Sequence, residues 1–398
     1  MKYGWIAAAV AVVCVFSACE KRKSSKEVFV ANMLSINNEE PVTYETGHLD
    51  DLLEGKEILT LKWTDISQMD GADVMALRKA KETLLNADMA KIRFIDDGTT
   101  YVGYSSEAEL VKPTELPQEF LYCFSLLLDV TLPEKVTGLG SLALSQCKAL
   151  QSCILPPKLE YMDRYCFNNC ISLKNITLPS SFKEMKRDSN FQLCSSLESI
   201  KFPDTTTDPG DDTFIDCTSL KSIHFGLGCK TIEDNIAIRC HSLEKVTVTS
   251  GSKYIKQDGE ALVSADGTRL LLQPYYCPSG DYKVKGCKNV SIYITSEPYS
   301  SIEFEEGCST VCASIRGCNY LNKVIFPSTI KTISEAPFIE YNPSVQVLEV
   351  RSTEPPYMED QEFVSKLGAR QIKVPASAVS AYKTAAKWSI YSSIISAI

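Results

Sequence analysis

The chain of 398 residues has a formal net charge of −9, with 44% hydrophobic and 23% charged residues. This length exceeds one small domain, and the apolar fraction excludes wholesale disorder. The acidic balance argues against a nucleic-acid partner, because phosphate binding needs a basic surface. Three histidines restrict histidine-dependent chemistry, and sixteen cysteines fall short of the density of a disulfide scaffold.

The first segment has the pattern of a secretory signal. Lys2 provides a short positive region, and residues 5–18 contain no charge. That stretch is shorter than the about 20 apolar residues that span a bilayer, so we expect a signal peptide over 1–18. The letters FSAC, which end at Cys19, resemble a bacterial lipobox. The resemblance implies that Cys19 is the lipid attachment site of an outer membrane lipoprotein, facing the cell surface or the periplasm. The alternative is a plain secretory peptide.

A polar, mostly basic segment follows and predicts a lipid-anchored tether over 19–45. The region 46–112 has the pattern of an N-terminal α/β cap. It predicts a strand around 58–63, a helix from Ala72 and a strand over 91–95. A cap is expected here because the open end of a repeat stack would expose its core.

A repeat of about 23 residues runs through much of the remaining chain. FNNCISLKNITLP begins at Phe167, FQLCSSLESIKFP at Phe191 and FIDCTSLKSIHFG at Phe214. This period lies in the leucine-rich-repeat range, and stacked copies bury Leu, Ile and Phe rows that one copy cannot bury alone. The repeated frame places one cysteine in each copy: Cys123, Cys147, Cys170, Cys194, Cys217, Cys240 and Cys318.

The frame F-x-x-C-x-S-L-x-x-I-x-L-P resembles the BspA-like, or Treponema-type, leucine-rich repeats. The segment DGEALVSADGTRLLLQP, at 258–274, is similar to an island that interrupts the repeats of Bacteroides members, and the ending from Ile372 is similar to their C-terminal cap. The resemblance implies an α/β repeat solenoid, a right-handed leucine-rich-repeat coil of about 23-residue repeats. We expect the solenoid over 113–350, with the island at 251–285.

Two local patterns concern the island and the chain after it. Asp-Gly pairs at 258–259 and 266–267 predict hairpin turns. The hydrophobic pattern of 223–232 matches that of 302–311, so the solenoid is expected to resume after the island.

The last segment, 351–398, predicts a short helical cap. Two short helices are expected over 376–386 and 389–398. Trp388 lies between them in the sequence, and we expect it to pack between them.

The frame cysteines would lie on successive coils, about 4.8 Å apart. We expect buried thiols that act as small hydrophobic groups with weak donors, although this spacing also permits a disulfide. Cys308, Cys312 and Cys318 lack the paired spacing of a zinc site. In an oxidising compartment a disulfide is a further alternative among the cysteines outside the frame, which are Cys166, Cys229, Cys277, Cys287, Cys308 and Cys312.

The strand face is the usual ligand surface of a solenoid. One outward column alternates in sign, which favours a solvated face whose charges pair along the sheet: Gln151, Lys174, Glu198, Lys221 and Glu244. The alternative is a ligand site. Lys201 and His224 are expected side by side in one column, Lys245 follows in another, and together they suit an acidic group.

An acidic loop between two repeats holds a second candidate site. Clustered carboxylates are ligands that Ca²⁺ uses, although their spacing here is not that of an EF-hand loop, and an acidic surface loop is the alternative. The calcium candidates are Asp204, Asp208, Asp211 and Asp212. Catalysis has no support, because the sequence has no phosphate-binding glycine loop, H-E-x-x-H or G-x-S-x-G motif. We therefore expect neither an enzyme nor a cofactor.

The family that the frame resembles is associated with adhesion and with host or interspecies contact. The resemblance therefore implies a cell-envelope lipoprotein whose leucine-rich-repeat binding module takes a protein or a glycan. The alternative is a structural or periplasm-facing envelope scaffold without an external ligand. We expect a monomer that contacts the membrane through its N-terminal lipid only and binds no nucleic acid.

Overall fold

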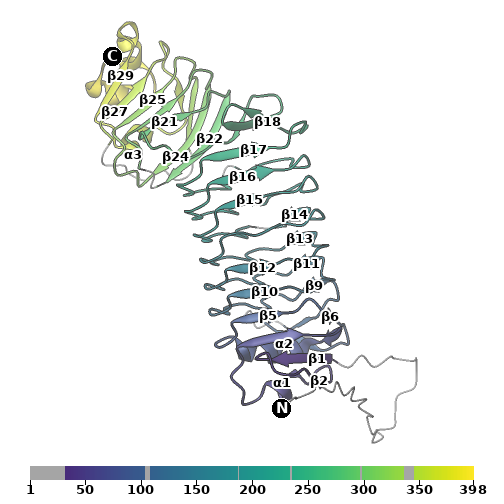
Figure 1. The fold of residues 1–398 in the computed structure, drawn as a ribbon. Coiled ribbons are helices and arrows are strands. Elements are labelled where there is room, and N and C mark those ends of the chain that lie inside the picture. Colours follow the sequence, from purple (N-terminus) through teal and green to yellow (C-terminus); the bar gives the residue numbers. More distant parts are fainter. Residues whose placement is uncertain (1–31, 104–107, 187, 234, 296–297, 336–344) are drawn as a thin grey trace, which may run out of the picture. The chain divides into compact units, whose positions relative to one another are not determined.

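The computed structural model describes residues 32–103, 108–186, 188–233, 235–295, 298–335 and 345–398 (Figure 1). Over these ranges the chain forms a solenoid of short strands, and strands of successive coils pair in parallel ladders. The predicted signal peptide and Cys19 lie outside the described residues. Within the described ranges, no helix has the length and apolar character needed to cross a bilayer.

The N-terminal end is closed by a six-stranded sheet. Its first strands, β1 and β2, pair antiparallel with each other, and β1 also pairs antiparallel with β3. The following strands are parallel from coil to coil. The order is β12-β10-β5-β3-β1-β2, with bounds β1 Asn32–Ile36, β2 Val42–Tyr44, β3 Thr60–Trp63, β5 Asn86–Asp88, β10 Asp129–Thr131 and β12 Ser152–Ile154.

Because of this sheet, the end of the tether and the start of the solenoid differ from the predicted boundaries. The expected tether, 19–45, contains β1 and β2, and Leu34 of β1 is fully buried. Asn37 and Asn38 after β1 both have positive φ, a left-handed conformation that asparagine tolerates, so the chain turns back there. The expected cap, 46–112, already contains parallel strands of the ladder, because β5 pairs with β10. The tether was therefore predicted too long, and the solenoid was predicted to start too late.

Short helices and two small sheets complete the N-terminal cap. The helix expected from Ala72 is α2, whose start is capped by Asp70 accepting a hydrogen bond from the amide of Asp73. The guanidinium of Arg78 donates to the carbonyls of Val102, Gln118 and Glu119, which joins the cap to the first coil. The elements are α1 Leu49–Leu53, α2 Gly71–Leu77, the 3₁₀ helix η1 Arg78–Ala80, and the pairs β4 Ser67–Met69 with β6 Ile92–Phe94 and β7 Thr100–Val102 with β8 Ala108–Leu110.

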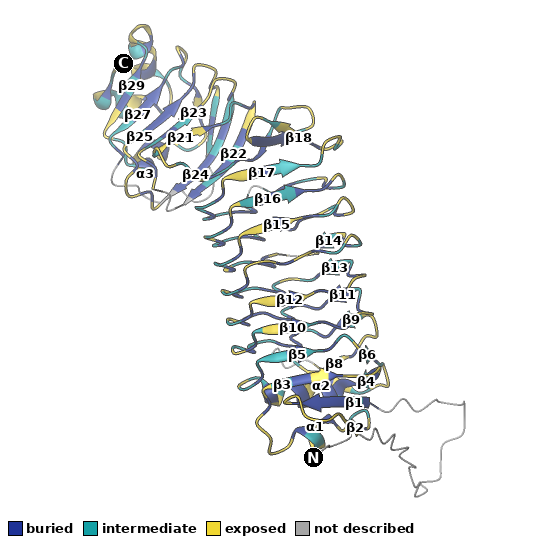
Figure 2. Cartoon of the chain, in the orientation of Figure 1, coloured by how far each residue is buried: buried dark blue, intermediate teal, exposed yellow. Residues whose placement is uncertain are grey.

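The middle coils carry two parallel ladders. Strands β12 and β15 each have one buried residue between two exposed ones, as expected for a strand with one face in the core (Figure 2). The first ladder contains β9 Glu115–Leu116, β11 Gly138–Leu139, β13 Tyr161–Met162 and β14 Glu184–Met185. The second contains β15 Ser199–Lys201, β16 Ser222–Phe225 and β17 Lys245–Val248.

Aromatic rings stack from coil to coil in the core. The ring centroids of Phe167 and Phe191 are 5.3 Å apart, and those of Phe191 and Phe214 are 6.0 Å apart, with nearly parallel planes. All three side chains are fully buried. The frame phenylalanine therefore makes a continuous apolar column, as the repeat predicted.

A second column, at the turn before each frame cysteine, has left-handed backbone. The residues there have φ between 59° and 65°, and none is glycine: Gln146, Asn169, Leu193, Asp216 and Arg239. Cross-coil contacts hold some of these side chains. Asn169 donates to the side-chain oxygen of Gln146 at 2.7 Å, and the guanidinium of Arg239 pairs with the carboxylate of Asp216. These contacts offset the strain of the left-handed conformation.

The island interrupts the ladder after β17. It is a three-stranded antiparallel sheet of β18 Ile255–Asp258, β19 Ala261–Ser264 and β20 Leu270–Leu272. Gly259 and Gly267 have positive φ, which confirms the turns predicted at the two Asp-Gly pairs. Strand β21 (Asp281–Val284) lies within the expected island range, 251–285, yet it pairs in parallel with β23 (Ser301–Phe304). The solenoid therefore resumes earlier than the sequence predicted.

Two parallel ladders follow the island. One has the order β21-β23-β25-β27-β29-β30, and the other has the order β22-β24-β26-β28. Phe304 and Cys308 are fully buried, as are Phe225 and Cys229 at the matching positions, which confirms the predicted correspondence of the two segments. The bounds are β22 Asn289–Thr295, β23 Ser301–Phe304, β24 Thr310–Arg316, β25 Lys323–Phe326, β26 Thr332–Glu335, β27 Val347–Val350, β28 Tyr357–Met358, β29 Gln371–Val374 and β30 Ile395–Ala397.

The C-terminal cap combines helices with the last strand of the ladder. Its helices are α3 Phe363–Leu367, η2 Ala376–Ala378, α4 Val379–Thr384 and η3 Ser389–Ile394. The helix predicted over 376–386 is present as η2 and α4. The helix predicted over 389–398 is wrong in its second half, since β30 pairs with β29 there. The ladder offers the backbone of that segment hydrogen bonds that a helix end would leave unmade. Trp388 is buried against Tyr382 of α4.

Candidate binding site

The outward columns of the strand face have the predicted register. Lys201 lies opposite His224, and His224 lies opposite Thr247. Lys245 lies in the neighbouring column, opposite Ser222. The structure therefore places the three candidate ligand residues on one sheet, with Lys201 and His224 adjacent and Lys245 on the last strand.

His224 is occupied by contacts within the chain. Its Nδ1 lies 2.9 Å from Thr247 Oγ1, and its Nε2 lies 3.1 Å from Thr249 Oγ1. Thr249 Oγ1 in turn donates to the carboxylate of Asp204 at 3.1 Å. Burial, and then the charge of Lys201, lower the pKa of His224, so the ring is neutral at neutral pH. An acidic group already lies beside this pair, and it comes from the same chain.

Three of the four aspartates proposed for calcium accept hydrogen bonds from separate partners. Asp204 accepts from the amide of Leu227, Asp208 accepts from the amide of Gly210, and Asp212 accepts from the side chain of Asn235. Burial is the first cause that raises the pKa values of Asp211 and Asp212. Over the described ranges, no group of three or more Asp, Glu, His or Cys side chains is arranged to hold a metal ion. The structure thus does not bring these aspartates to one centre.

The cysteine ladder consists of buried thiols that donate to the preceding coil. The Sγ of Cys194 lies 3.1 Å from the carbonyl of Phe167, that of Cys217 lies 3.1 Å from Phe191, and that of Cys240 lies 3.0 Å from Phe214. The fourteen described cysteines are thiols, including those for which a disulfide was the alternative. This arrangement confirms the expected role, a small buried group with a weak donor, for Cys147, Cys170, Cys194, Cys217 and Cys240. The prediction is wrong for Cys123, which is half-buried with a left-handed backbone; its copy has one extra residue, so Phe124 takes the buried place.

We expect alkylation to distinguish these thiols by burial. Burial raises the pKa of Cys194 to about 12 and that of Cys308 to about 11, which keeps both groups protonated and unreactive at neutral pH. Half-buried Cys123, Cys277 and Cys312 are expected to react with iodoacetamide in the native chain, and the buried cysteines only after denaturation. Mass spectrometry of the labelled chain counts the alkylated cysteines. Few labels on the denatured, unreduced chain would contradict the thiol assignment.

On the strand face, the edge of β17 that is turned away from β16 is not paired with a further strand of its sheet. Strand β17 is the last strand of its sheet. The amides of Lys245 and Thr249 donate to Lys221 and Phe225 on the side of β16. A parallel strand directs the backbone groups of alternate residues to opposite sides, so Val246 and Val248 direct theirs away from β16.

A cavity of about 850 Å³ lies along this edge. It is lined by residues 244–252 on one side and by the first island hairpin, 255–257 and 259–260, on the other. Strands β18 and β19 contact β17 there, and Figure 1 shows β18 beside β17. The floor is apolar, with Val246 and Ile255 buried, and exposed Lys245 belongs to the wall. Of the residues proposed from the sequence, Lys245 is the one in the wall.

Gln257 partly covers the open edge. Its Nε2 lies 3.3 Å from the carbonyl of Val246 and also within hydrogen-bond distance of the carbonyls of Gly259 and Ala261. The side-chain amide thus occupies the place at which a further strand would donate an N–H group. No pattern in the sequence indicates this role, because only the fold brings Gln257 to β17.

Two further cavities follow on the other side of the hairpin. One, of about 380 Å³, is lined in part by Asp258 and Lys285, which form an ion pair at 3.3 Å. The other, of about 510 Å³, is lined by His241, Tyr320 and the segments 275–280 and 298–300. Gly259 and Glu260 line both the first and the second cavity, and Tyr276 and Cys277 line both the second and the third. The three cavities therefore adjoin one another around the island.

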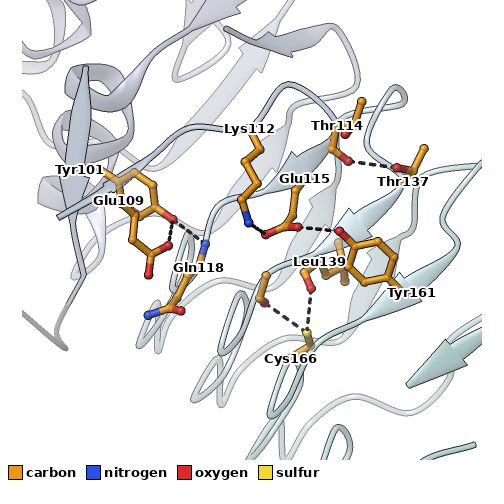
Figure 3. A network of polar contacts seen from close by, with 11 residues as sticks. Tyr101, Glu109, Lys112, Thr114, Glu115, Gln118, Thr137, Leu139, Tyr161 and Cys166 are labelled. Atoms are coloured by element: carbon orange, nitrogen blue, oxygen red, sulfur yellow. Dashed lines mark hydrogen bonds and ion pairs between the residues drawn. The ribbon is translucent and has the colours of Figure 1, made fainter. Parts of the chain in front are cut away.

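A polar cluster near the N-terminal cap is structural. Glu115 accepts hydrogen bonds from Tyr161 at 2.6 Å and from Lys112 at 3.0 Å, and the hydroxyl of Tyr101 accepts from the amide of Gln118 at 2.9 Å (Figure 3). The ammonium group of Lys186 lies 3.3 Å from the centroid of the Tyr161 ring. These groups satisfy one another across neighbouring coils, so the cluster joins the cap to the solenoid.

Parallel coils of about 23 residues, with buried Leu, Ile and Phe columns, define a leucine-rich-repeat solenoid. The family of BspA type leucine-rich repeat regions matches residues 114–244, 187–259 and 289–386, more than half of the chain. The chain belongs to this family.

Solved structures of bacterial leucine-rich-repeat proteins are similar to the chain. A protein from Eubacterium ventriosum is 17% identical, with a TM-score of 0.48 over 80% of this chain and 74% of that one. A leucine-rich cell surface protein from Faecalibacterium prausnitzii is 18% identical, with a TM-score of 0.46 over 80% and 85%. A leucine-rich-repeat protein from T. pallidum is 23% identical, with a TM-score of 0.34 over 48% and 78%. No curated protein matches the sequence significantly.

Proposed function

We propose that the protein is a binding module of the cell envelope, anchored through a lipid on Cys19 and used for adhesion. Repeat families of this type generally act as binding scaffolds rather than as enzymes. The N-terminal signal pattern and the FSAC motif support the anchor. The outer membrane is the proposed location, with the solenoid on the outside of the cell.

The ligand that best suits the first cavity is an extended segment of a partner protein. The observation that carries this proposal is the open edge of β17, since β17 ends its sheet and a cavity of about 850 Å³ lies against it. The backbone groups of Val246 and Val248 are directed into that space. A strand added there would gain main-chain hydrogen bonds and place alternate side chains on the apolar floor. Its entering N–H group would replace the amide of Gln257 at the carbonyl of Val246.

Photo-crosslinking on intact cells tests both the site and its orientation. A photoreactive residue replaces Lys245, which is in the cavity wall. The matched control carries it at Ser199, an exposed position of the same column two coils earlier. Cells that display the full chain are mixed with host mucosal proteins and irradiated. We expect protein adducts from position 245, mapping to one short segment of the partner, and background yield from position 199.

The edge itself is tested by proline at position 248. Proline is tolerated where the lost N–H points out of a sheet, so Val248→Pro removes an edge donor and leaves the ladder with β16 intact. Val248→Ala also removes most of the valine side chain but keeps the backbone N–H donor. We expect Val248→Pro to reduce adducts from position 245 to the level of the Ser199 control, and Val248→Ala to retain them. Equal yields from both variants would overturn strand addition. Adducts that form only after the outer membrane is broken would favour the periplasm-facing scaffold instead.

A further inference from the structure

The third cavity has a chemical character unlike that of the other two. Its wall contains the tyrosines Tyr275, Tyr276, Tyr299 and Tyr320 and the prolines Pro278 and Pro298. No lysine, arginine, aspartate or glutamate lines it, whereas the first cavity is lined by Lys245, Lys256, Glu244 and Glu260. An uncharged ligand with apolar faces therefore suits this cavity.

Two tyrosines of the cavity wall, Tyr275 and Tyr299, are buried and belong to one aromatic stack. The ring centroids of Tyr282 and Tyr299 are 4.4 Å apart with nearly parallel planes, and Tyr275 stacks on the other side of Tyr282 at 6.4 Å. The hydroxyl of Tyr299 donates to the carbonyl of Tyr275, and that of Tyr282 donates to the carbonyl of Pro274 at 3.0 Å. These bonds fix the chain where it leaves the island, so the cavity is formed before any ligand arrives.

The rim presents tyrosine faces to solvent. Tyr320 is 74% exposed and Tyr276 is 51% exposed, although both are large aromatic side chains. Tyr320 occupies a frame position that holds serine in most copies, as in the sequences around Cys194, Cys217 and Cys240. The folding core does not need an exposed ring there, whereas aromatic rings with a polar tip are well suited to contact a ligand.

Exposed hydroxyl groups in the wall supply polar contacts. Ser300 Oγ lies 3.0 Å from the carbonyl of Gly280 and 3.1 Å from the carboxylate of Asp281. Ser279 Oγ accepts from the amide of Asp281 at 3.3 Å and lies 3.3 Å from Cys277 Sγ. A hydroxyl has one donor and two acceptor sites, so both serines keep acceptor capacity for the hydroxyl groups of a ligand. A volume of about 510 Å³ suits a small ligand or the end of a chain.

We propose that this tyrosine cavity binds the end of an uncharged saccharide. A sugar ring has an apolar C–H face, which packs against Tyr276 and Tyr320, and hydroxyl groups, which bond to Ser279 and Ser300. The site is separate from the polypeptide site at β17, so it extends the proposed function and does not depend on it. It gives an envelope protein a means of contact with glycan-covered surfaces.

Binding of the full chain to immobilised neutral, sialylated and sulfated oligosaccharides tests the proposal. We expect wild type to bind neutral members of the panel. Tyr320→Ala and Tyr276→Ala should weaken that binding by about tenfold each, whereas Tyr320→Phe should retain it, because the ring face makes the contact. Tyr357→Ala is the matched control, since Tyr357 is 61% exposed and does not line the cavity.

Three results would overturn the proposal. The first is the absence of binding to any neutral oligosaccharide, and the second is Tyr320→Ala binding as strongly as Tyr357→Ala. The third is a proline-rich peptide, rather than a saccharide, that binds in a Tyr320-dependent manner, since aromatic grooves also take such peptides. Crosslinking from position 245 is measured on the same variants. It should be unaffected by Tyr320→Ala, so failure of one site is distinguishable from failure of the other.

Discussion

Phe191→Ala is expected to destabilise the middle of the solenoid by about 3–5 kcal/mol, the usual cost of removing a buried phenylalanine ring. Phe191 is fully buried between the rings of Phe167 and Phe214. In a repeat protein each coil contacts its neighbours, so the loss of this ring weakens two interfaces at once. Because the strand ladder is rigid, the neighbouring coils cannot move together to fill the space that the ring leaves.

Hydrogen exchange localises this effect. The amides of Phe191 and Leu193 donate to the carbonyls of Thr213 and Ile215 on the next coil, and their exchange should accelerate in Phe191→Ala. Ile171→Ala is the control, because Ile171 is a partly exposed side chain of a neighbouring turn. It should change the free energy of unfolding by about 0.5 kcal/mol or less. Similar exchange in both variants would show that the phenylalanine column does not stabilise the coils.

Trp388→Ala is expected to open the C-terminal cap. The Trp388 ring is 1% exposed, lies edge-on to Tyr382 at 5.0 Å, and its Nε1 donates to the carbonyl of Pro356 at 2.8 Å. Truncation leaves a cavity and an unpaired carbonyl, for a loss of about 3–5 kcal/mol. Strand β30 follows the Trp388 turn and pairs with β29, so its amides should lose protection first.

Two variants separate packing from hydrogen bonding at this position. Trp388→Phe keeps an aromatic ring and loses the donor to Pro356, so it should be less destabilising than Trp388→Ala. Ile390→Ala changes an exposed side chain of the same turn and should be nearly neutral. Chemical denaturation, with hydrogen exchange of residues 371–397, gives the comparison. A cap that unfolds equally in Ile390→Ala and Trp388→Ala would contradict a specific role of the indole ring.

The repeat register could be predicted from the sequence because one signal was repeated many times. The Cys and Leu positions recur from copy to copy, and Phe begins several of the copies, so a strand in one coil fixes the alignment of the next. The prediction that Lys201 and His224 lie opposite each other on neighbouring strands followed from that alignment, and the structure confirms it. The buried thiols from Cys147 to Cys240 followed as well, since a cysteine repeated at one inward position packs as a small apolar group. Cys123 did not, because the extra residue in its copy puts Phe124 in the buried place.

The turns could not be predicted in the same way. Leu193 and Arg239 have left-handed backbone, which local sequence preference assigns to glycine or asparagine. The amide of Leu193 donates to the carbonyl of Ile215 on the next coil, and the guanidinium of Arg239 pairs with the carboxylate of Asp216. Such contacts exist only after stacking. Strands β1 and β30 were missed for a similar reason, because a short segment becomes a strand when a sheet edge is available to pair with it.

The candidate site was only partly visible in the sequence. Lys245 was named for its charge, yet its place in the cavity wall depends on the end of the sheet at β17. Gln257, Tyr276 and Tyr320 were not named. Tyr320 could have been found, because it departs from the serine of the frame at a position that faces solvent. Gln257 and Tyr276 carry no such signal, since the island has no repeat against which to compare them.

The left-handed column also determines how this sequence can vary over evolution. At a positive φ a β-branched side chain meets its own backbone, whatever its polarity. Positions 146, 169, 193, 216 and 239 can therefore exchange an amide, an acid, a base or a leucine, as the five coils already do, but valine, isoleucine and threonine are excluded. Selection at this turn therefore acts on branching at the β-carbon rather than on charge or hydrophobicity. A measure of chemical similarity between residues would not predict which substitutions are accepted here.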